Sequence, residues 1–246
     1  MIKSVLFDLD GTLLPLDQDA FLREYLRLFG IRVAGIVEPK KFIDQLLAST
    51  MIMIGSNDRT KTNQQVFFED FLPNIGVDEA VLLPVINDFY KTDFCAAKVT
   101  SSENAAARRA VTTVALLGLD VVVATNPVFP LAAVKQRLGW AGLSDIKFSH
   151  ITSYEHCHFC KPNPEYYLEV ARRIDRKPEE CLMVGNDVEE DLIAATIGMK
   201  TFLVTDYLLN QKKLAYTADY QGTLQELAES IGEIIMAENG TAGKLA

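Results

Sequence analysis

The sequence predicts an α/β fold, a doubly wound parallel sheet with an inserted, all-helical cap. Short β-branched runs alternate with helical patterns along most of the chain, which is typical of parallel strands joined by helices. After the first strand, a long stretch with helical periodicity alone interrupts this alternation. We therefore expect a core made of residues 1–15 and 97–246, with a helical cap at residues 16–96.

The first predicted strand is the apolar run Ile2–Phe7, which ends at two acidic residues. In the section that follows, apolar residues recur at spacings of three and four, and this pattern predicts about four helices and no strand. Gly30, Gly55 and Gly76 mark expected helix ends. The polar stretch Asn57–Asn63 between two of these helices is expected to be solvated.

Beyond residue 97 the sequence again alternates between helical and strand-like patterns. Helices are expected over residues 103–117, 130–140, 164–174, 192–197 and 224–235. Strands are expected over residues 119–124, 145–149, 181–184 and 201–204. The last residues, 238–246, are expected to be frayed.

Composition excludes several classes of protein. With 246 residues, 49% of them hydrophobic and 23% charged, the chain is typical of a globular protein with a substantial core. A net charge of −9 argues against non-specific binding to nucleic acid or to an anionic membrane. No apolar run approaches the roughly 20 residues that span a bilayer, and no signal-peptide pattern precedes the first strand. Because four cysteines do not make a disulfide scaffold in a chain of this length, we expect a cytoplasmic location.

Two acids, Asp8 and Asp10, follow the first predicted strand and precede Gly11. The period of two in a strand turns both side chains to the same side, and the Asp-Gly pair predicts a turn. Like charges this close repel, so one acid would take up a proton unless a cation lay beside them. The sequence therefore predicts a site that attracts a cation where this strand ends.

Other polar residues follow later strands or begin later helices. Thr125 and Asn126 come after the strand at 119–124, and Lys161 precedes the helix at 164–174. Asp187 follows the strand at 181–184, with Asp191 four residues further on. Since ligands bind at the carboxyl ends of parallel strands, we expect all these residues at one edge of the sheet.

Taken in order, these residues resemble the motifs of the haloacid dehalogenase superfamily, and specifically of its phosphatase-like branch. The segment Asp8-Leu9-Asp10-Gly11-Thr12 is similar to the first motif of that family. Thr125 matches the second motif, Lys161 the third, and Asp187 with Asp191 the fourth. Many members carry an acid directly after the glycine of the fourth motif. This chain has Asn186 there, which leaves the register of that loop open.

The resemblance implies a role for each residue, and the chemistry of the side chains supports it. Asp8 is the candidate nucleophile that forms an aspartyl-phosphate, and Asp10 the general acid and base. Thr125 and Asn126 would donate hydrogen bonds to phosphoryl oxygens. Lys161 would neutralise the phosphoryl group and keep the nucleophile ionised.

The expected cofactor is Mg²⁺, which prefers oxygen ligands and is usually held by one or two carboxylates. We expect Asp8, the backbone carbonyl of Asp10, and Asp187 to hold it. Asp191 is expected to lie outside the metal ligands and to orient Lys161 or a metal-bound water.

The acids between Asp187 and Asp191 are open to two interpretations. Glu189 and Glu190 are expected to face solvent, although Glu190 could take the place of Asp191.

The segment His156-Cys157-His158-Phe159-Cys160 carries a competing signal. Cys157 and Cys160 have the spacing of half a zinc site, and His156 and His158 lie beside them. No second Cys-x-x-Cys pair exists in the sequence. We favour a loop that positions Lys161 and keep a structural zinc site as the alternative.

The sequence thus predicts a Mg²⁺-dependent hydrolase that acts on the phosphomonoester of a small metabolite, with no nucleic acid or membrane as partner. A phosphomutase of the same fold is the nearest alternative, because it would use the same two acids. A non-catalytic protein that binds a phosphorylated ligand is a more distant one. Neither the substrate nor the oligomeric state follows from the sequence.

Overall fold

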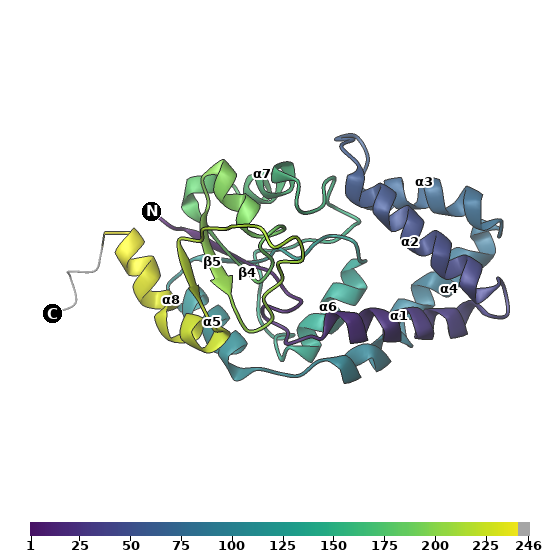
Figure 1. The fold of residues 1–246 in the computed structure, drawn as a ribbon, viewed down its shortest axis with the longest axis horizontal. Coiled ribbons are helices and arrows are strands. Elements are labelled where there is room, and N and C mark those ends of the chain that lie inside the picture. Colours follow the sequence, from purple (N-terminus) through teal and green to yellow (C-terminus); the bar gives the residue numbers. More distant parts are fainter. Residues whose placement is uncertain (241–246) are drawn as a thin grey trace.

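The computed structural model describes residues 1–240, and in these a six-stranded parallel sheet has the order β3-β2-β1-β4-β5-β6 (Figure 1). The strands are β1 (Ser4–Phe7), β2 (Asp120–Val123), β3 (His150–Ile151), β4 (Cys181–Gly185), β5 (Lys200–Val204) and β6 (Tyr220–Gly222). All five neighbouring pairs run parallel. The strand order reverses direction at β1, which lies between β2 and β4.

Helices cover both faces of the sheet. Figure 1 shows α5 (Ala105–Leu116) and α8 (Leu224–Glu238) below the sheet and α7 (Pro164–Arg173) above it. Alternation along β1 explains this arrangement, because Val5 and Phe7 pack in the core that contains α5 and α8. Leu6 points the other way and packs with Tyr166 and Tyr167 of α7. The doubly wound parallel sheet is therefore confirmed.

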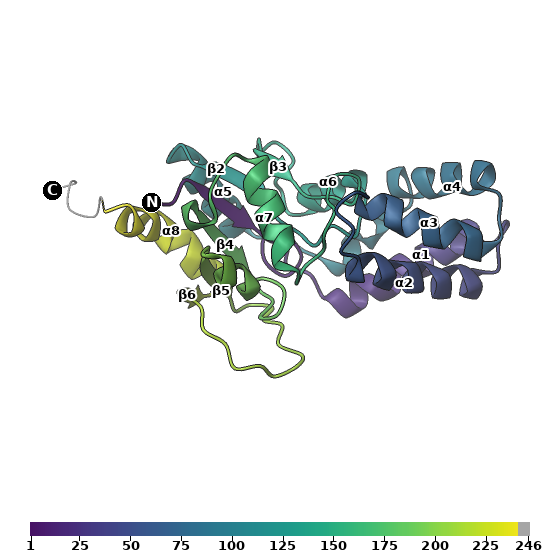
Figure 2. The same cartoon turned by 90° about the horizontal axis from the view of Figure 1, so that it is seen from above.

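Four helices lie together beyond the end of the sheet, at the right of Figures 1 and 2. They are α1 (Gln18–Val33), α2 (Pro39–Gly55), α3 (Asn63–Ile75) and α4 (Glu79–Lys91). Aromatic side chains fill the space between them, and the rings of Phe29 and Phe89 stack with centroids 3.9 Å apart. Burying rings of this size supplies much of the packing energy of the group.

The chain leaves the sheet for these helices and returns from them at adjacent points. Leu16 and Ser101 form an antiparallel bridge. The backbone N–H of Asp17 donates to the carbonyl of Thr100 at 3.4 Å, and that of Ser102 to the carbonyl of Pro15 at 3.2 Å. The returning segment is a 3₁₀ helix, η1 (Phe94–Thr100), followed by α5.

Two sequence-based expectations about individual elements were wrong, and one strand was missed. A strand was expected at residues 145–149, but β3 is His150–Ile151, because pairing with Val122 and Val123 sets its register. Gly30 does not end a helix. It lies inside α1, where a Cβ atom would come within 3.4 Å of Ile43 on α2. The strand β6, at the edge of the sheet, was not expected at all.

The remaining helices complete the connections between strands. They are α6 (Leu131–Trp140) and two further 3₁₀ helices, η2 (Pro178–Glu180) and η3 (Leu192–Ile197). Of the frayed end expected at residues 238–246, Glu238 ends α8, and residues 241–246 lie outside the described part. Among the described residues, no helix has the length and apolar character needed to cross a membrane.

Candidate active site

A cavity of about 110 Å³ lies at the carboxyl ends of β1, β2 and β4. Its lining is polar and consists of Asp8, Asp10, Gln18, Thr125, Asn126, Asn186, Asp187, Glu190 and Asp191. Lys161 lies fully buried beside it, within hydrogen-bonding distance of two of the acids. The structure therefore brings all the residues selected from the sequence to one place. We call this the carboxylate cavity.

The turn after β1 fixes the position of Asp8 and Asp10. The backbone N–H of Asp8 donates to the carbonyl of Val184 at 2.8 Å, which extends the pairing of β1 with β4. Gly11 then has φ of +83°, in the left-handed region where glycine is favoured. A Cβ atom there would lie 2.5 Å from Nδ2 of Asn186. The glycine thus allows the first and fourth motifs to pack directly against each other.

Lys161 joins two carboxylates below the cavity. Its Nζ donates to Oδ1 of Asp8 at 2.8 Å and to Oδ1 of Asp191 at 2.6 Å. Burial disfavours the charge on Lys161, but the attraction of Asp191 and Asp8 outweighs it and holds the lysine pKa well above its usual range. The ammonium group is therefore permanently charged at neutral pH.

The single positive charge of Lys161 does not keep the pKa of Asp8 at its ordinary value. Burial raises the pKa of Asp8 to about 8; Lys161 opposes this rise, and the neighbouring charges of Asp191 and Asp10 add to it. Further positive charge beside Asp8 would therefore favour its ionised form.

Asp10 has a partner that the sequence did not reveal. Its Oδ2 is in an ion pair with Arg137 of α6, whose side chain is fully buried. Burial raises the pKa of Asp10, and the charge of Arg137 opposes this rise. Within an amphipathic helix an arginine is usually solvated, and no sequence signal marks Arg137 as an exception.

After β2, the carbonyl of Thr125 and the side chain of Asn126 already form hydrogen bonds within the protein. The carbonyl of Thr125 accepts hydrogen bonds from Oγ1 of Thr152 at 2.7 Å and from the hydroxyl of Tyr166 at 2.9 Å. Oδ1 of Asn126 accepts from the backbone N–H of Lys161 at 3.2 Å, while its Nδ2 donates to the carbonyl of Lys161 at 3.4 Å. In this structure the Asn126 side chain holds the Lys161 loop in place.

The loop after β4 has a defined register. The side chain of Asn186 is held by two hydrogen bonds: its Nδ2 donates to the carbonyl of Tyr207 at 2.7 Å, and its Oδ1 accepts from Thr12 at 2.9 Å. Asp187 lines the carboxylate cavity, and burial raises its pKa. The backbone N–H of Asp187 donates to Oδ2 of Asp191 at 2.9 Å, so Asp191 fixes both this loop and Lys161.

Glu190 does not face solvent, contrary to the sequence-based expectation. Its Oε1 accepts a hydrogen bond from Nδ2 of Asn126 at 2.9 Å, and its side chain lines the cavity. Burial raises its pKa to about 7. Glu189 is half-buried and forms an ion pair with Lys212. Glu190 also does not replace Asp191, because Asp191 is the acid in contact with Lys161.

In the cysteine and histidine segment, the side chains of His158 and Cys160 have hydrogen-bond partners within the protein. Nδ1 of His158 lies 2.8 Å from Oε1 of Glu169. Cys157 is buried, and burial raises the pKa of its thiol to about 12. Sγ of Cys160 accepts a hydrogen bond from Nδ2 of Asn63 at 3.2 Å. Over residues 1–240, no three His, Cys, Asp or Glu side chains are gathered so that they could together hold a metal ion.

The start of α3 is attached to the same segment, so the expectation that residues 57–63 are solvated is wrong at Asn63. This side chain is fully buried, and its Nδ2 also donates to the carbonyls of Pro127 and Phe159, both at 3.3 Å. Its backbone N–H donates to the carbonyl of Cys157 at 2.7 Å. The helices beyond the sheet are therefore tied to the loop that carries Lys161.

A magnesium site at this cavity would need fewer than three protein carboxylates, since Mg²⁺ usually keeps several waters and also binds substrate phosphate. Asp8 and Asp187 both line the cavity and both have raised pKa values that a cation would lower. Oδ1 of Asp10 is buried without a hydrogen-bond partner. The donor set therefore fits Mg²⁺ bound by two carboxylates and completed by other oxygens.

Comparisons with known proteins agree with this geometry. The model of the haloacid dehalogenase-like hydrolases matches residues 2–196. A glyceraldehyde 3-phosphate phosphatase of Methanothermobacter thermautotrophicus is 36% identical over 67 residues, which cover 27% of this chain and 30% of the relative, so the match spans less than a third of that protein. A protein of the same name from Methanopyrus kandleri is 28% identical over 211 residues, covering 82% of this chain and 83% of the relative.

A solved structure shows the same fold. The HAD phosphatase from Thermococcus onnurineus matches with a TM-score of 0.57 and 21% identity, covering 94% of this chain and 98% of that one. Its helices and sheet are therefore arranged like those described above.

Proposed function

Because the chain belongs to the haloacid dehalogenase-like hydrolases, we propose that it is a phosphomonoesterase that acts on a small phosphorylated molecule through an aspartyl-phosphate on Asp8. One observation carries this proposal. Lys161, fully buried, contacts both Asp8 and Asp191 at the end of the sheet where ligands bind. A buried lysine shared by two acids is costly to maintain, and it has a purpose if the cavity receives an anion.

In the first step, an oxygen of Asp8 attacks phosphorus, the bond to the leaving alkoxide breaks, and Asp10 donates a proton to the leaving oxygen. In the second step, Asp10 removes a proton from a water that attacks the aspartyl-phosphate, which releases phosphate and regenerates Asp8. Lys161 lies beside Asp8 and balances negative charge on the transferring group.

We propose Mg²⁺ as the cofactor, held by Asp8, the backbone carbonyl of Asp10, and Asp187. When bound, it would supply positive charge for the oxygens of the transferring group. Asp191 would hold Lys161 and the Asp187 backbone in place, as its two hydrogen bonds already do here. Thr125 and Asn126 line the cavity and are the proposed neighbours of the phosphoryl oxygens.

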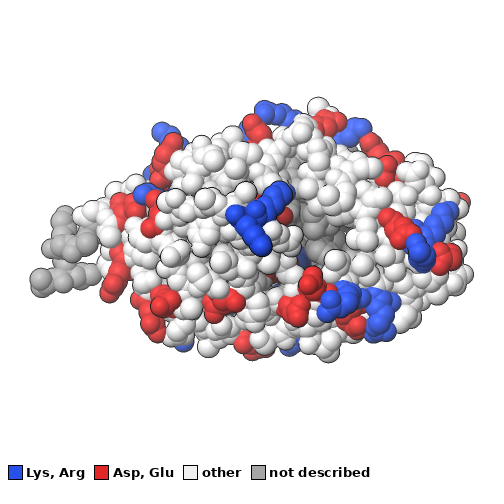
Figure 3. All heavy atoms as spheres, viewed as in Figure 1, with Lys and Arg blue, Asp and Glu red and all other residues white. Residues whose placement is uncertain are grey.

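The helices α1–α4 are the proposed cap. Gln18, at the start of α1, lines the carboxylate cavity, so movement of this helix would change access to Asp8 and Asp10. Figure 3 shows a hollow on this face between the sheet-containing part and the helices. A cap that closes over this region would keep water away until the intermediate has formed.

The test is release of phosphate from an aryl phosphate by the purified protein with and without Mg²⁺. We expect activity that requires Mg²⁺ and falls at least about 10³-fold in Asp8→Asn, because an amide cannot form the intermediate. Full activity of Asp8→Asn would overturn the assignment of the nucleophile. Labelled phosphate that ends on a second hydroxyl of the substrate, instead of on water, would indicate a phosphomutase.

A further inference from the structure

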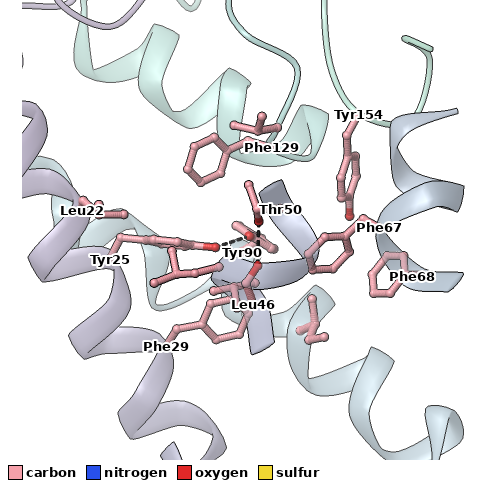
Figure 4. A pocket seen from close by; sticks show the side chains of 13 residues that line it. Leu22, Tyr25, Phe29, Leu46, Thr50, Phe67, Phe68, Tyr90, Phe129 and Tyr154 are labelled. Carbon is pink, nitrogen blue, oxygen red and sulfur yellow. Dashed lines mark hydrogen bonds between the residues drawn. The ribbon is translucent and has the colours of Figure 1, made fainter. Parts of the chain in front are cut away.

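A second cavity, of about 140 Å³, lies between the helices α1–α4 and the loops after β2 and β3 (Figure 4). Its walls are mainly aromatic and aliphatic side chains from all four helices, together with Val128, Phe129 and Tyr154. Protein interiors contain few voids of this size, and an apolar cavity of about 150 Å³ can hold a benzene molecule. We call it the apolar cavity.

Successive turns of α1 line the carboxylate cavity and the apolar cavity. Gln18 lines the carboxylate cavity, whereas Leu22, Tyr25 and Phe29 line the apolar one. These residues are spaced at intervals of four, three and four, which places them on one face of the helix. One helix face therefore runs from the catalytic acids into the apolar cavity.

A second, independent segment also lines both cavities. Thr125 and Asn126 line the carboxylate cavity, and Val128 and Phe129, two and three residues further on, line the apolar cavity. The ring of Phe129 lies 4.5 Å from the guanidinium carbon of Arg137, which is paired with Asp10. The carboxylate of Asp10 is therefore one residue away from the wall of the apolar cavity.

The apolar cavity lies on the side of Asp10, which is the side where the leaving alcohol must lie. Asp10 gives its proton to the leaving oxygen, so the alcohol part of a substrate extends from the phosphoryl group on the side of Asp10. The side chain of Asp10 is paired with Arg137, and the guanidinium group of Arg137 lies over the ring of Phe129. The alcohol part would therefore meet the apolar cavity.

The polar groups in the wall are already paired, so they do not require a polar ligand. The hydroxyls of Tyr25 and Tyr90 lie 2.8 Å apart, and Oγ1 of Thr50 donates to the carbonyl of Leu46 at 2.8 Å. Leu22 and Leu47, which also line the cavity, are 44% and 40% exposed. The cavity is thus apolar inside, and the side chains at its opening to the surface are apolar as well.

A wider cavity of about 540 Å³ shares Gln18 and Asn186 with the carboxylate cavity. Its lining includes Asp17, Asp19 and Asp206. These three aspartates repel a ligand that carries negative charge beyond its phosphate group. A polar alcohol part would instead lie in this wider cavity. In that case the enzyme would show no preference for a phenyl group.

We propose that the apolar cavity binds the alcohol part of the substrate, so that the preferred substrates are phosphomonoesters of alcohols that carry a phenyl-sized apolar group. This inference rests on the proposed phosphomonoesterase function and adds the substrate class to it.

The first measurement compares kcat/KM for 2-phenylethyl phosphate and ethyl phosphate, whose leaving alcohols have similar acidity. Burying a phenyl group is expected to favour 2-phenylethyl phosphate by about 10- to 100-fold. Equal values for the two esters would overturn the inference and leave the phosphomonoesterase function intact. Hydrolysis of neither, nor of any aryl phosphate, would overturn both.

The second measurement uses a pair of variants on α2. Thr50→Phe fills the cavity, whereas Met51→Phe adds the same ring at a neighbouring position that is 66% exposed and does not line it. We expect Thr50→Phe to lower kcat/KM for 2-phenylethyl phosphate at least about 10-fold relative to that for ethyl phosphate. Met51→Phe should leave both values unchanged. An equal loss on both esters in Thr50→Phe would count against the cavity as the binding site.

A binding measurement separates the cavity from catalysis. The alcohol 2-phenylethanol, added alone, should raise the melting temperature of the wild-type protein and of Met51→Phe, but not that of Thr50→Phe. Ethanol at the same concentration is the control. No difference between the two alcohols with the wild-type protein would overturn the inference whether or not the Thr50→Phe variant folds.

Discussion

Arg137 and Asp10 form an ion pair that joins α6 to the turn after β1, and the side chain of Arg137 is fully buried. The guanidinium group has no exposed surface, and its Nε and Nη2 have no hydrogen-bond partner among the described residues. A buried charge of this kind is tolerated only when an opposite charge lies beside it. The protonation of Asp10, and with it the proposed acid and base steps, therefore depends on Arg137.

Replacing Arg137 with methionine should shift the pH dependence of the proposed reaction. Burial already raises the pKa of Asp10, and removing the positive charge that opposes this effect raises it further. The step in which Asp10 acts as a base therefore needs a higher pH, and the acidic limb of the kcat profile should move upward. The measurement is kcat against pH for the wild type and for Arg137→Met.

The stability of the same variant gives a second readout. Removing one partner of a fully buried pair costs about 3–5 kcal/mol of unfolding free energy, and we expect a smaller loss here because the Asp10 side chain is 19% exposed. The double variant Arg137→Met, Asp10→Asn should recover part of this loss, because no uncompensated carboxylate remains. Arg137→Lys keeps the charge and should keep the wild-type pH profile. If kcat has the same pH dependence in the wild type, Arg137→Met and Arg137→Lys, then Arg137 does not control the protonation of Asp10.

Asp8 should make the metal-free protein less stable as the pH rises. Its pKa is about 8 in the folded protein and 3.8 ordinarily, so between these values the folded state holds a proton that the unfolded state has lost. The free energy of unfolding therefore falls through this range, by at most about 1.4 kcal/mol per pH unit. In Asp8→Asn this contribution is absent, so the variant should gain stability relative to the wild type from pH 5 to pH 8.

Denaturant titrations in buffer without divalent cations measure this difference. Asp19→Asn, which removes an exposed acid at the start of α1, is the matched control and should follow the wild type at every pH. A constant offset between Asp8→Asn and the wild type across the range would contradict the prediction.

Mg²⁺ should stabilise the protein through Asp187. A ligand that binds only the folded state adds about 2.7 kcal/mol at one hundred times its dissociation constant, and this appears as a higher melting temperature. Asp187→Asn removes a proposed ligand, so most of the increase should disappear. Glu189→Gln, which changes a nearby acid that pairs with Lys212 instead, should retain it. A full increase in Asp187→Asn would remove Asp187 from the proposed site.

Gly11→Ala should destabilise the turn that carries Asp8 and Asp10. The left-handed φ of +83° costs a residue with a side chain about 1–2 kcal/mol, and the new Cβ atom would collide with Asn186. We expect a loss of about 2 kcal/mol or more, together with reduced activity. Gly35→Ala is the control, because a Cβ atom there meets nothing within 4 Å. Equal stability of the two variants would contradict the prediction.

Much of the sheet could be predicted because each central strand is defined by its own residues. β1 and β4 are short apolar runs followed directly by polar turns, and parallel topology then places the turns together. The edge strands were harder to predict. β3 has only two residues and depends on Val122 and Val123 for its register, and β6 (Tyr220–Gly222) is exposed or half-buried and has no apolar run.

The parts of the site that escaped prediction depend on contacts between distant segments. Arg137 and Glu190 carry charges that a sequence pattern assigns to the surface, and only the packing of α6 and of the loop after β4 buries them. Most helical residues that line the apolar cavity, among them Tyr25, Phe29 and Phe67, are ones that periodicity correctly assigns to the inside. That periodicity cannot show where the helices fail to fill the space between them.

The hydrogen bonds between residues 15–17 and 100–102 have a consequence for the order of folding. Ser4 pairs with Asp120, so forming the central strand pair closes a long loop, which costs entropy in proportion to the logarithm of its length. The helices α1–α4 rely on contacts within one continuous segment whose two ends emerge side by side. Once that segment is folded, only the residues outside it remain to be ordered when β1 and β2 pair, so closing the loop costs less entropy. We therefore expect the helices to form early and to bring β1 and β2 together.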